Sequence, residues 1–242
     1  MIQFFTRIPI RLQLDVQTED FSKGAKWLPF VGLIIGSALA GLDLLIAPRL
    51  SPFTTAILLV FAEVFLTGGL HLDGLSDSFD GLYSNRDKAR ILEIMKDSRL
   101  GANGALALLA FVMIKTALLM ELPMGPGRTT ILLAFPIFAR WAIVIASAIS
   151  PYAREKGMGN LFIGKLTSST VIFASIFTAL TMILEPALGV FYGVTVVFAN
   201  LYCRHTKKII GGMTGDTLGA LIELTSVLLI GVGLALHLMG LI

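Results

Sequence analysis

Long apolar runs alternate with short polar connections along the 242 residues of the chain. Seven runs approach the roughly 20 apolar residues that a helix needs to cross the hydrocarbon core of a bilayer. They cover residues 28–47, 52–72, 103–121, 130–149, 169–184, 186–203 and 218–241. The apolar and polar alternation of membrane β-barrel strands is absent, so helices must satisfy the backbone hydrogen bonds. The pattern predicts an all-α, polytopic integral membrane bundle of about seven transmembrane helices.

Composition supports a membrane protein of one domain. Apolar residues make up 55% of the chain and charged residues 14%, and the mean hydropathy of +0.84 is far above that of a water-soluble domain. No linker, low-complexity tract or internal repeat divides residues 1–242. The single cysteine, Cys203, excludes an intrachain disulfide and a CxxC site. The N-terminus, MIQFFTRIPIRLQLD, lacks the apolar length and cleavage site of a signal peptide, so we expect it in the mature protein.

The positive charges predict an orientation in the membrane. Of the 19 lysines and arginines, 15 precede the first run or lie in the second, fourth and sixth connections between runs. By the positive-inside rule, the N-terminus and these connections face the cytoplasm and the C-terminus faces outward. The pI of about 9.1 therefore mainly reflects topology, which leaves some anion binding open, and nucleic acid is not expected as a partner.

Three aspartates mark a candidate site in the stretch GGLHLDGLSDSFDGLYSNRD. On a helix, Asp73, Asp77 and Asp80 project from one face, about 6 and 4.5 Å apart along the axis. This spacing can share one or two divalent cations, and oxygen ligands favour Mg²⁺ or Mn²⁺ over zinc. The alternative is a solvated helix end. It is disfavoured because three aligned like charges, in a chain so poor in charge, repel one another unless a cation lies between them.

Two neighbouring residues, Glu63 and His71, have open roles. Glu63 lies on nearly the same face but about 15 Å from Asp73 on a straight helix, so it joins the site only if Gly68 and Gly69 bend the chain. His71 suits a ligand or a base, although a histidine at a helix end more often forms a local hydrogen bond.

Arg140 falls near the middle of an apolar run, where a charge is costly unless it is paired or functional. Neutralisation by Glu63 or Asp43 is favoured over direct substrate contact. Acidic residues within a bundle also suit a cation-coupled or proton-coupled transporter, which is the competing class of function. Against it, the polar clusters gather at the cytoplasmic face and the chain has no inverted repeat. A third class of function, a scaffold for a biosynthetic complex, would leave the aspartates unexplained.

Two further segments on the cytoplasmic side suit phosphate binding. Lys96 and Arg99, in EIMKDSRLGANG, are cations three residues apart, expected on one face, although a basic collar at the membrane surface is an alternative. In IIGGMTGDTLGALIE, a glycine-rich turn places Thr214 and Asp216 at the start of the last helix, where an anion can bind. Carboxylates, cations and this turn together describe phosphoryl or nucleotidyl transfer at a membrane surface.

The motifs FFTRIPI, GGLHLDGLSDSFDGL, LEIMKDSRLGANG, FARWA, YAREKGMGNLF and GGMTGDTLGALIEL, in this order, resemble the cobalamin synthase family, the adenosylcobinamide-GDP ribazoletransferases. The resemblance implies a Mg²⁺-dependent enzyme of the cell inner membrane, with its active site facing the cytoplasm. The expected reaction, a late step of cobalamin biosynthesis, joins adenosylcobinamide-GDP to α-ribazole or its 5′-phosphate and releases GMP. A homo-oligomer or a larger biosynthetic complex is left open.

The residues and the resemblance together predict three groups of site residues. The metal, Mg²⁺ or in its place Mn²⁺, is assigned to Asp73, Asp77, Asp80 and Glu63. The catalytic residues are Asp80, His71 and Asp216: Asp80 is narrowly ahead of His71 as the base, and Asp216 is assigned either to the edge of a second metal or to the incoming hydroxyl. The residues expected to bind substrate are Lys96, Arg99, Asn103, Thr214, Gly215, Arg7 and Arg154.

Overall fold

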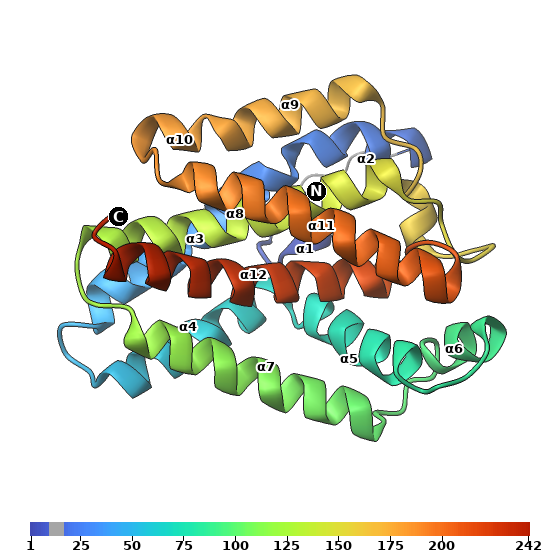
Figure 1. The fold of residues 1–242 in the computed structure, drawn as a ribbon, viewed down its shortest axis with the longest axis horizontal. Coiled ribbons are helices and arrows are strands. Elements are labelled where there is room, and N and C mark those ends of the chain that lie inside the picture. Colours follow the sequence, from blue (N-terminus) through green and yellow to red (C-terminus); the bar gives the residue numbers. More distant parts are fainter. Residues whose placement is uncertain (10–16) are drawn as a thin grey trace.

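The structure, a computed structural model, describes residues 1–9 and 17–242, and its regular elements are all helices (Figure 1). Arg11, one of the N-terminal basic residues, lies outside the described residues. The elements are α1 (Ile2–Phe5), α2 (Thr18–Gly24), η1 (Ala25–Trp27), α3 (Leu28–Ile46), α4 (Pro52–Thr67), α5 (Leu70–Leu82), α6 (Lys88–Ile94), α7 (Ala102–Glu121), α8 (Pro126–Ile149), η2 (Met158–Leu161), α9 (Ser168–Ala179), α10 (Thr181–Leu184), α11 (Leu188–Ile210) and α12 (Gly215–Leu238).

Each of the seven predicted runs is helical, which confirms the all-α membrane bundle, but fewer than seven are complete spans. Within the described residues, four helical segments are long and apolar enough to cross a bilayer, and a fifth is added if α4 and α5 count as one broken span. Helix α9 has only 12 residues, and α11 carries Lys207 and Lys208 in its last turn. By length and composition, the described residues therefore contain fewer transmembrane helices than the seven predicted.

Helix α8 forms the centre of the bundle, with α3, α11 and α12 packed around it. Almost all of its length is buried, including Trp141 and Phe138. Gly32 and Gly36 of α3 lie against the α8 backbone so closely that a Cβ at either position would collide with it. The small residues of GLIIGSALAG, residues 32–41, therefore allow close helix contact.

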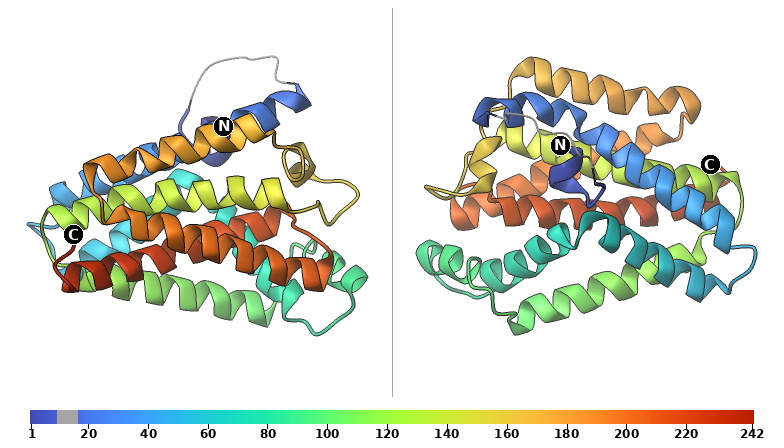
Figure 2. Two further views of the ribbon diagram at one scale, coloured as in Figure 1. Left: turned by 45° about the horizontal axis from the view of Figure 1, so that its top comes forward. Right: turned by 180° about the vertical axis from the view of Figure 1, so that it is seen from behind.

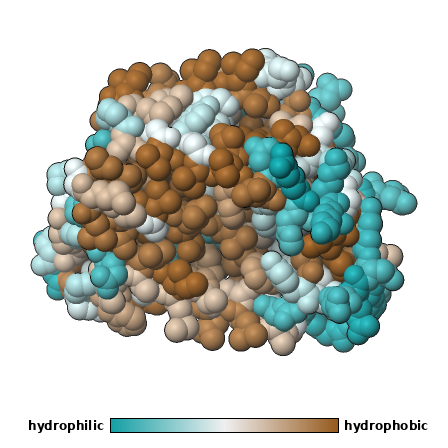
Figure 3. Space-filling model, in the orientation of Figure 1, coloured by the Kyte–Doolittle hydropathy of each residue, from teal (hydrophilic) through white to brown (hydrophobic). Residues whose placement is uncertain are grey.

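The second predicted run does not form a straight helix. Helix α4 ends at Thr67, and α5 leaves it at an angle of 94°. Gly68 and Gly69, at φ 66° and 72°, form the bend in the left-handed region that glycine adopts most readily. The right view of Figure 2 shows α4 and α5 as two arms that meet at this bend. The bend directs α5 and its aspartates toward the end of the molecule where hydrophilic residues gather (Figure 3).

Candidate active site

Helix α5 carries the aspartates, and its observed bounds confirm that they share one helix. Asp73 is exposed and Asp77 is half-buried. Between them, Gly74 lies against α12, where an added Cβ would come within 2.7 Å of the backbone oxygen of Asp216. Reciprocally, a Cβ on Gly219 of α12 would lie 3.3 Å from the Cα of His71. The two helices thus approach at backbone distance, which places Asp73 beside the start of α12.

The start of α12 brings two predicted residues into direct contact. The Thr214 side chain caps the helix by accepting a hydrogen bond from the backbone N–H of Thr217. Asp216, in the first turn, forms an ion pair with Arg154, whose Nη2 lies 2.7 Å from Oδ2. The loop that carries Arg154 is held here because Ala153 donates to the carbonyl of Met213. Gly215, also predicted, is the first residue of the helix and lines a pocket with Asp216.

Asp80 has a structural task that the sequence analysis missed. Its two carboxylate oxygens accept hydrogen bonds from the backbone N–H groups of Gly101 and Gly104, both at 2.8 Å. Asp80 therefore caps the N-terminus of α7, where the N-cap residue, Gly101, has no side chain to do so. Its predicted roles as metal ligand and base stay predictions. In either role, the Asp80 carboxylate would act while it also accepts these two hydrogen bonds.

The expectation that Lys96 and Arg99 share one helix face is wrong. Helix α6 ends at Ile94 and α7 begins at Ala102, so both residues lie in the connection between them. Arg99 forms an ion pair with Asp97 at 2.6 Å, and its hydrogen bonds lower the pKa of Asp97 to about 2. Asp97 therefore stays ionised at neutral pH and keeps its attraction for Arg99. Asn103, also predicted to bind substrate, donates a hydrogen bond to the carbonyl of Tyr83.

Glu63 and His71 belong to a buried ionic cluster. Lys115 Nζ lies 2.6 Å from Glu63 and 3.7 Å from Glu223. Arg140 Nη1 lies 3.4 Å from Glu63, and His71 Nδ1 lies 3.8 Å from Glu223. The prediction that Arg140 is neutralised by Glu63 is confirmed.

The other candidate partner of Arg140, Asp43, pairs with Arg128 instead, at 2.9 Å. Glu63 is thus engaged with two buried cations, Lys115 and Arg140. Its assignment as a metal ligand depended on the bend at Gly68 and Gly69. That bend is present, but the metal role remains a prediction.

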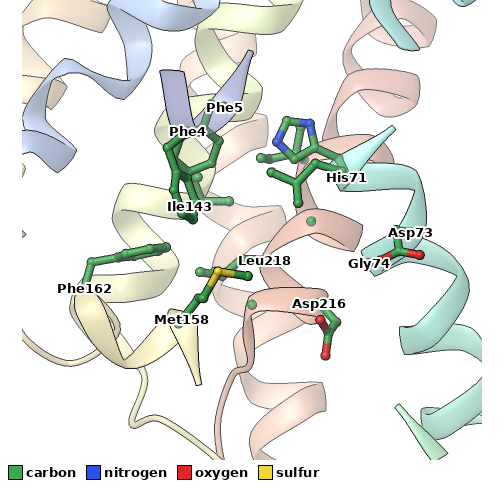
Figure 4. A pocket seen from close by; sticks show the side chains of 15 residues that line it. Phe4, Phe5, His71, Asp73, Gly74, Ile143, Met158, Phe162, Asp216 and Leu218 are labelled. Carbon is green, nitrogen blue, oxygen red and sulfur yellow. The ribbon is translucent and has the colours of Figure 1, made fainter. Parts of the chain in front are cut away.

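Three pockets meet at Asp73. One, of about 130 Å³, is lined mainly by aromatic and aliphatic side chains and also by His71 and Asp216 (Figure 4). The second contains Arg7, whose side chain lies against Gly68 at the bend. The third contains Asp77 and Arg99. Lys96 is exposed and lines none of the three.

The site suits a hard divalent cation only in part. Among the described residues, no three side chains of Asp, Glu, His or Cys are grouped closely enough to hold a metal ion by themselves. Asp73 and Asp77 do line one pocket with Arg99. Magnesium commonly binds through one or two carboxylates together with substrate phosphates and water. Two aspartates and a phosphorylated substrate fit that pattern, whereas a complete cage of protein ligands does not.

Comparison with known proteins places the chain in a family. The family described as Cobalamin-5-phosphate synthase matches residues 1–234. Three relatives named adenosylcobinamide-GDP ribazoletransferase come from Alkaliphilus metalliredigens, Clostridium acetobutylicum and Clostridioides difficile. They are 44%, 40% and 39% identical to this chain, over 93% of its length and 89%, 90% and 91% of theirs. No solved structure matches. The chain therefore belongs to the cobalamin-5-phosphate synthase family.

Proposed function

We propose that the chain is an adenosylcobinamide-GDP ribazoletransferase of cobalamin biosynthesis. Family membership over residues 1–234 is the observation that carries this proposal. The relatives share the transferase name, so the transporter alternative has no support. The proposed acceptor is α-ribazole or its 5′-phosphate.

The proposed reaction exchanges one phosphorus–oxygen bond for another. A ribose hydroxyl of the acceptor attacks the phosphorus joined to the cobinamide. The bond from that phosphorus to the bridging oxygen breaks, and GMP leaves with the electron pair. Asp73 and Asp77 would hold Mg²⁺ beside the phosphates of the donor, where the ion would supply positive charge.

Residues of the chain surround the place where this reaction would occur. Arg99, in the pocket with Asp73 and Asp77, supplies a cation for the phosphate oxygens of the donor. Arg7 supplies a second cation from the other side of Asp73. Asp216 and His71 both line the apolar pocket beside Asp73, so either can accept the proton of the attacking hydroxyl.

The proposed location is the inner membrane, with these residues open to the cytoplasm. The basic connections support this orientation. The α6–α7 and α8–α9 connections are two of them and carry the site residues Arg99 and Arg154, and both connections lie at one end of the bundle (Figure 1).

Mass spectrometry of a reaction mixture tests the function. The purified full chain in detergent is incubated with adenosylcobinamide-GDP, α-ribazole and Mg²⁺. We expect a coupled corrinoid together with GMP in equal amounts. Asp77→Asn is expected to abolish the product, while Glu121→Gln, an exposed acid at the far end of α7, leaves it unchanged. Failure of the folded wild-type protein to form either product would contradict the proposal.

A further inference from the structure

The pocket of Figure 4 has one apolar side and one polar edge. The rings of Phe4, Phe5 and Phe162 gather on the side away from Asp73 and Asp216. Phe4 and Phe5 come from α1 and Phe162 directly follows η2, so segments far apart in sequence meet in the pocket. His71 lies beside Phe5, with the two ring centroids 5.8 Å apart (Figure 4), and neither of its ring nitrogens has a hydrogen-bond partner among the described residues.

The size of the pocket limits what it can hold. Its volume of about 130 Å³ is well below the roughly 300–1,000 Å³ of pockets that enclose whole drug-sized ligands. A corrin ring cannot enter. One planar group of a larger molecule, such as a base, is the kind of ligand that a small apolar pocket with flanking aromatic rings accepts.

Two bases occur in the proposed reaction, and their polarity separates them. Guanine, in the donor, carries a carbonyl, an amine and a ring N–H, each of which needs a hydrogen-bond partner when buried. The phenylalanine, leucine and isoleucine side chains that line this pocket carry neither an N–H group nor an oxygen atom. The dimethylbenzimidazole of ribazole is apolar apart from one unsubstituted ring nitrogen, and the lining holds one imidazole, that of His71, beside Phe5.

We infer that this pocket binds the benzimidazole base of the acceptor, an inference that rests on the proposed function. A base seated among Phe4, Phe5 and Phe162 places the attached ribose toward the polar edge, beside Asp73 and Asp216. The donor then occupies the other two pockets that meet at Asp73, where Arg7 and Arg99 lie. Acceptor and donor thus approach Asp73 from different sides.

Two variants test the inference with little risk to folding. Phe4 is only half-buried, and Met158, another lining residue, is 65% exposed. Phe4→Ala and Met158→Ala are expected to raise the KM for α-ribazole, by about tenfold for Phe4→Ala and less for Met158→Ala. Neither should change the KM for adenosylcobinamide-GDP. Phe65→Ala, which removes an aromatic ring that is 80% exposed on α4, is the matched control and should change neither.

A binding measurement separates this inference from the proposed function. Calorimetry with 5,6-dimethylbenzimidazole and the full chain, without donor or metal, should show binding that Phe4→Ala weakens about tenfold and that guanosine does not compete with. This result upholds the pocket even if no coupled product forms. A higher KM for the donor in either variant, or displacement by guanosine, overturns the inference. Unchanged KM values, or equal binding to wild type and Phe4→Ala, or no binding to wild type, overturn it as well.

Discussion

Besides His71, the buried ionic cluster contains two carboxylates, Glu63 and Glu223, and two cations, Lys115 and Arg140. All four side chains are at most 4% exposed. Lys115 also lies over the rings of Phe111 and Phe135, at 4.9 and 5.0 Å. Such clusters add little net stability compared with apolar residues, but removal of one member leaves a buried charge without its partner. The cluster stands next to the bend that orients α5, so its integrity supports the acidic helix.

Replacement of Lys115 alone should therefore lower the stability of the protein more than replacement of Lys115 and Glu63 together. We expect Lys115→Met to lower the free energy of unfolding by about 3–5 kcal/mol because it leaves the cluster one negative charge in excess. The double variant Lys115→Met with Glu63→Gln restores the balance of charge and should recover much of this loss. Thermal unfolding in one detergent measures both. Lys165→Met, at an exposed position, is the control, and a double variant less stable than Lys115→Met would contradict the argument.

Asp73 and Arg99 line one pocket, but their removal should have different effects. Asp73→Ala removes a proposed metal ligand, so remaining activity should require a much higher concentration of Mg²⁺, or Mn²⁺. Arg99→Ala should leave the Mg²⁺ midpoint unchanged and lower the rate about a hundredfold, or by roughly 3 kcal/mol. Magnesium titrations at saturating donor distinguish them, with exposed Arg86→Ala as the control. A shifted midpoint for Arg99→Ala alone would mean that the roles are reversed.

At single residues, the sequence predicts a contact where a group left without a partner would cost much free energy. The pairing of Arg140 with Glu63 is predictable because a charge within an apolar run needs a partner. The capping of α7 by Asp80 is not, since 21 and 24 residues separate Asp80 from its two donors. The placement of Lys96 and Arg99 also escapes prediction, because their spacing suggests a shared face only while the chain stays helical.

Contact between α5 and α12 depends on Gly74. Gly74→Ala would bring a Cβ within 2.7 Å of the Asp216 backbone oxygen, and rigid backbone must then move. We expect a large loss of activity, because the shift separates Asp73 from Asp216. Gly41→Ala on α3 is the matched control: nothing lies within 4 Å of the added Cβ. It should leave activity unchanged and stabilise the helix by about 0.5–1 kcal/mol. Specific activity and thermal unfolding measure both variants, and full activity of Gly74→Ala would refute this account.

Most helices follow from the length of the apolar runs, and the predicted and observed bounds of α3 and α12 differ by only a few residues. The break between α4 and α5 is harder to foresee, because an apolar run containing two glycines also fits a continuous helix. The apolar pocket is harder still. Phe162 is typical of packing positions, and only the folded chain brings it together with Phe4. Pockets made by segments distant in sequence leave no periodic signal.

On the scale of the whole molecule, the site elements gather at one end of the bundle. The C-terminal part of α5, helix α6 and the start of α12 lie near one another there, and the connection between α7 and α8 lies at the opposite end (Figures 1 and 2). Hydrophilic residues also concentrate at the site end (Figure 3). The proposed activity uses a nucleotide-bearing donor, and the proposed orientation turns this end of the bundle toward the cytoplasm.

Labelling of cysteines in intact cells tests this orientation. Arg86→Cys lies on the exposed connection before α6, and Met124→Cys lies between α7 and α8, where the native residue is 59% exposed. An impermeant thiol reagent should modify Met124→Cys and spare Arg86→Cys until the membrane is permeabilised, after which both should react. The native Cys203 is buried and should contribute little background. Because 15 of the 19 basic residues are predicted to fall on the side of Arg86, the reverse pattern would contradict the positive-inside rule for this chain. It would also place the aspartates of α5 outside the cytoplasm, away from the nucleotide they are proposed to bind.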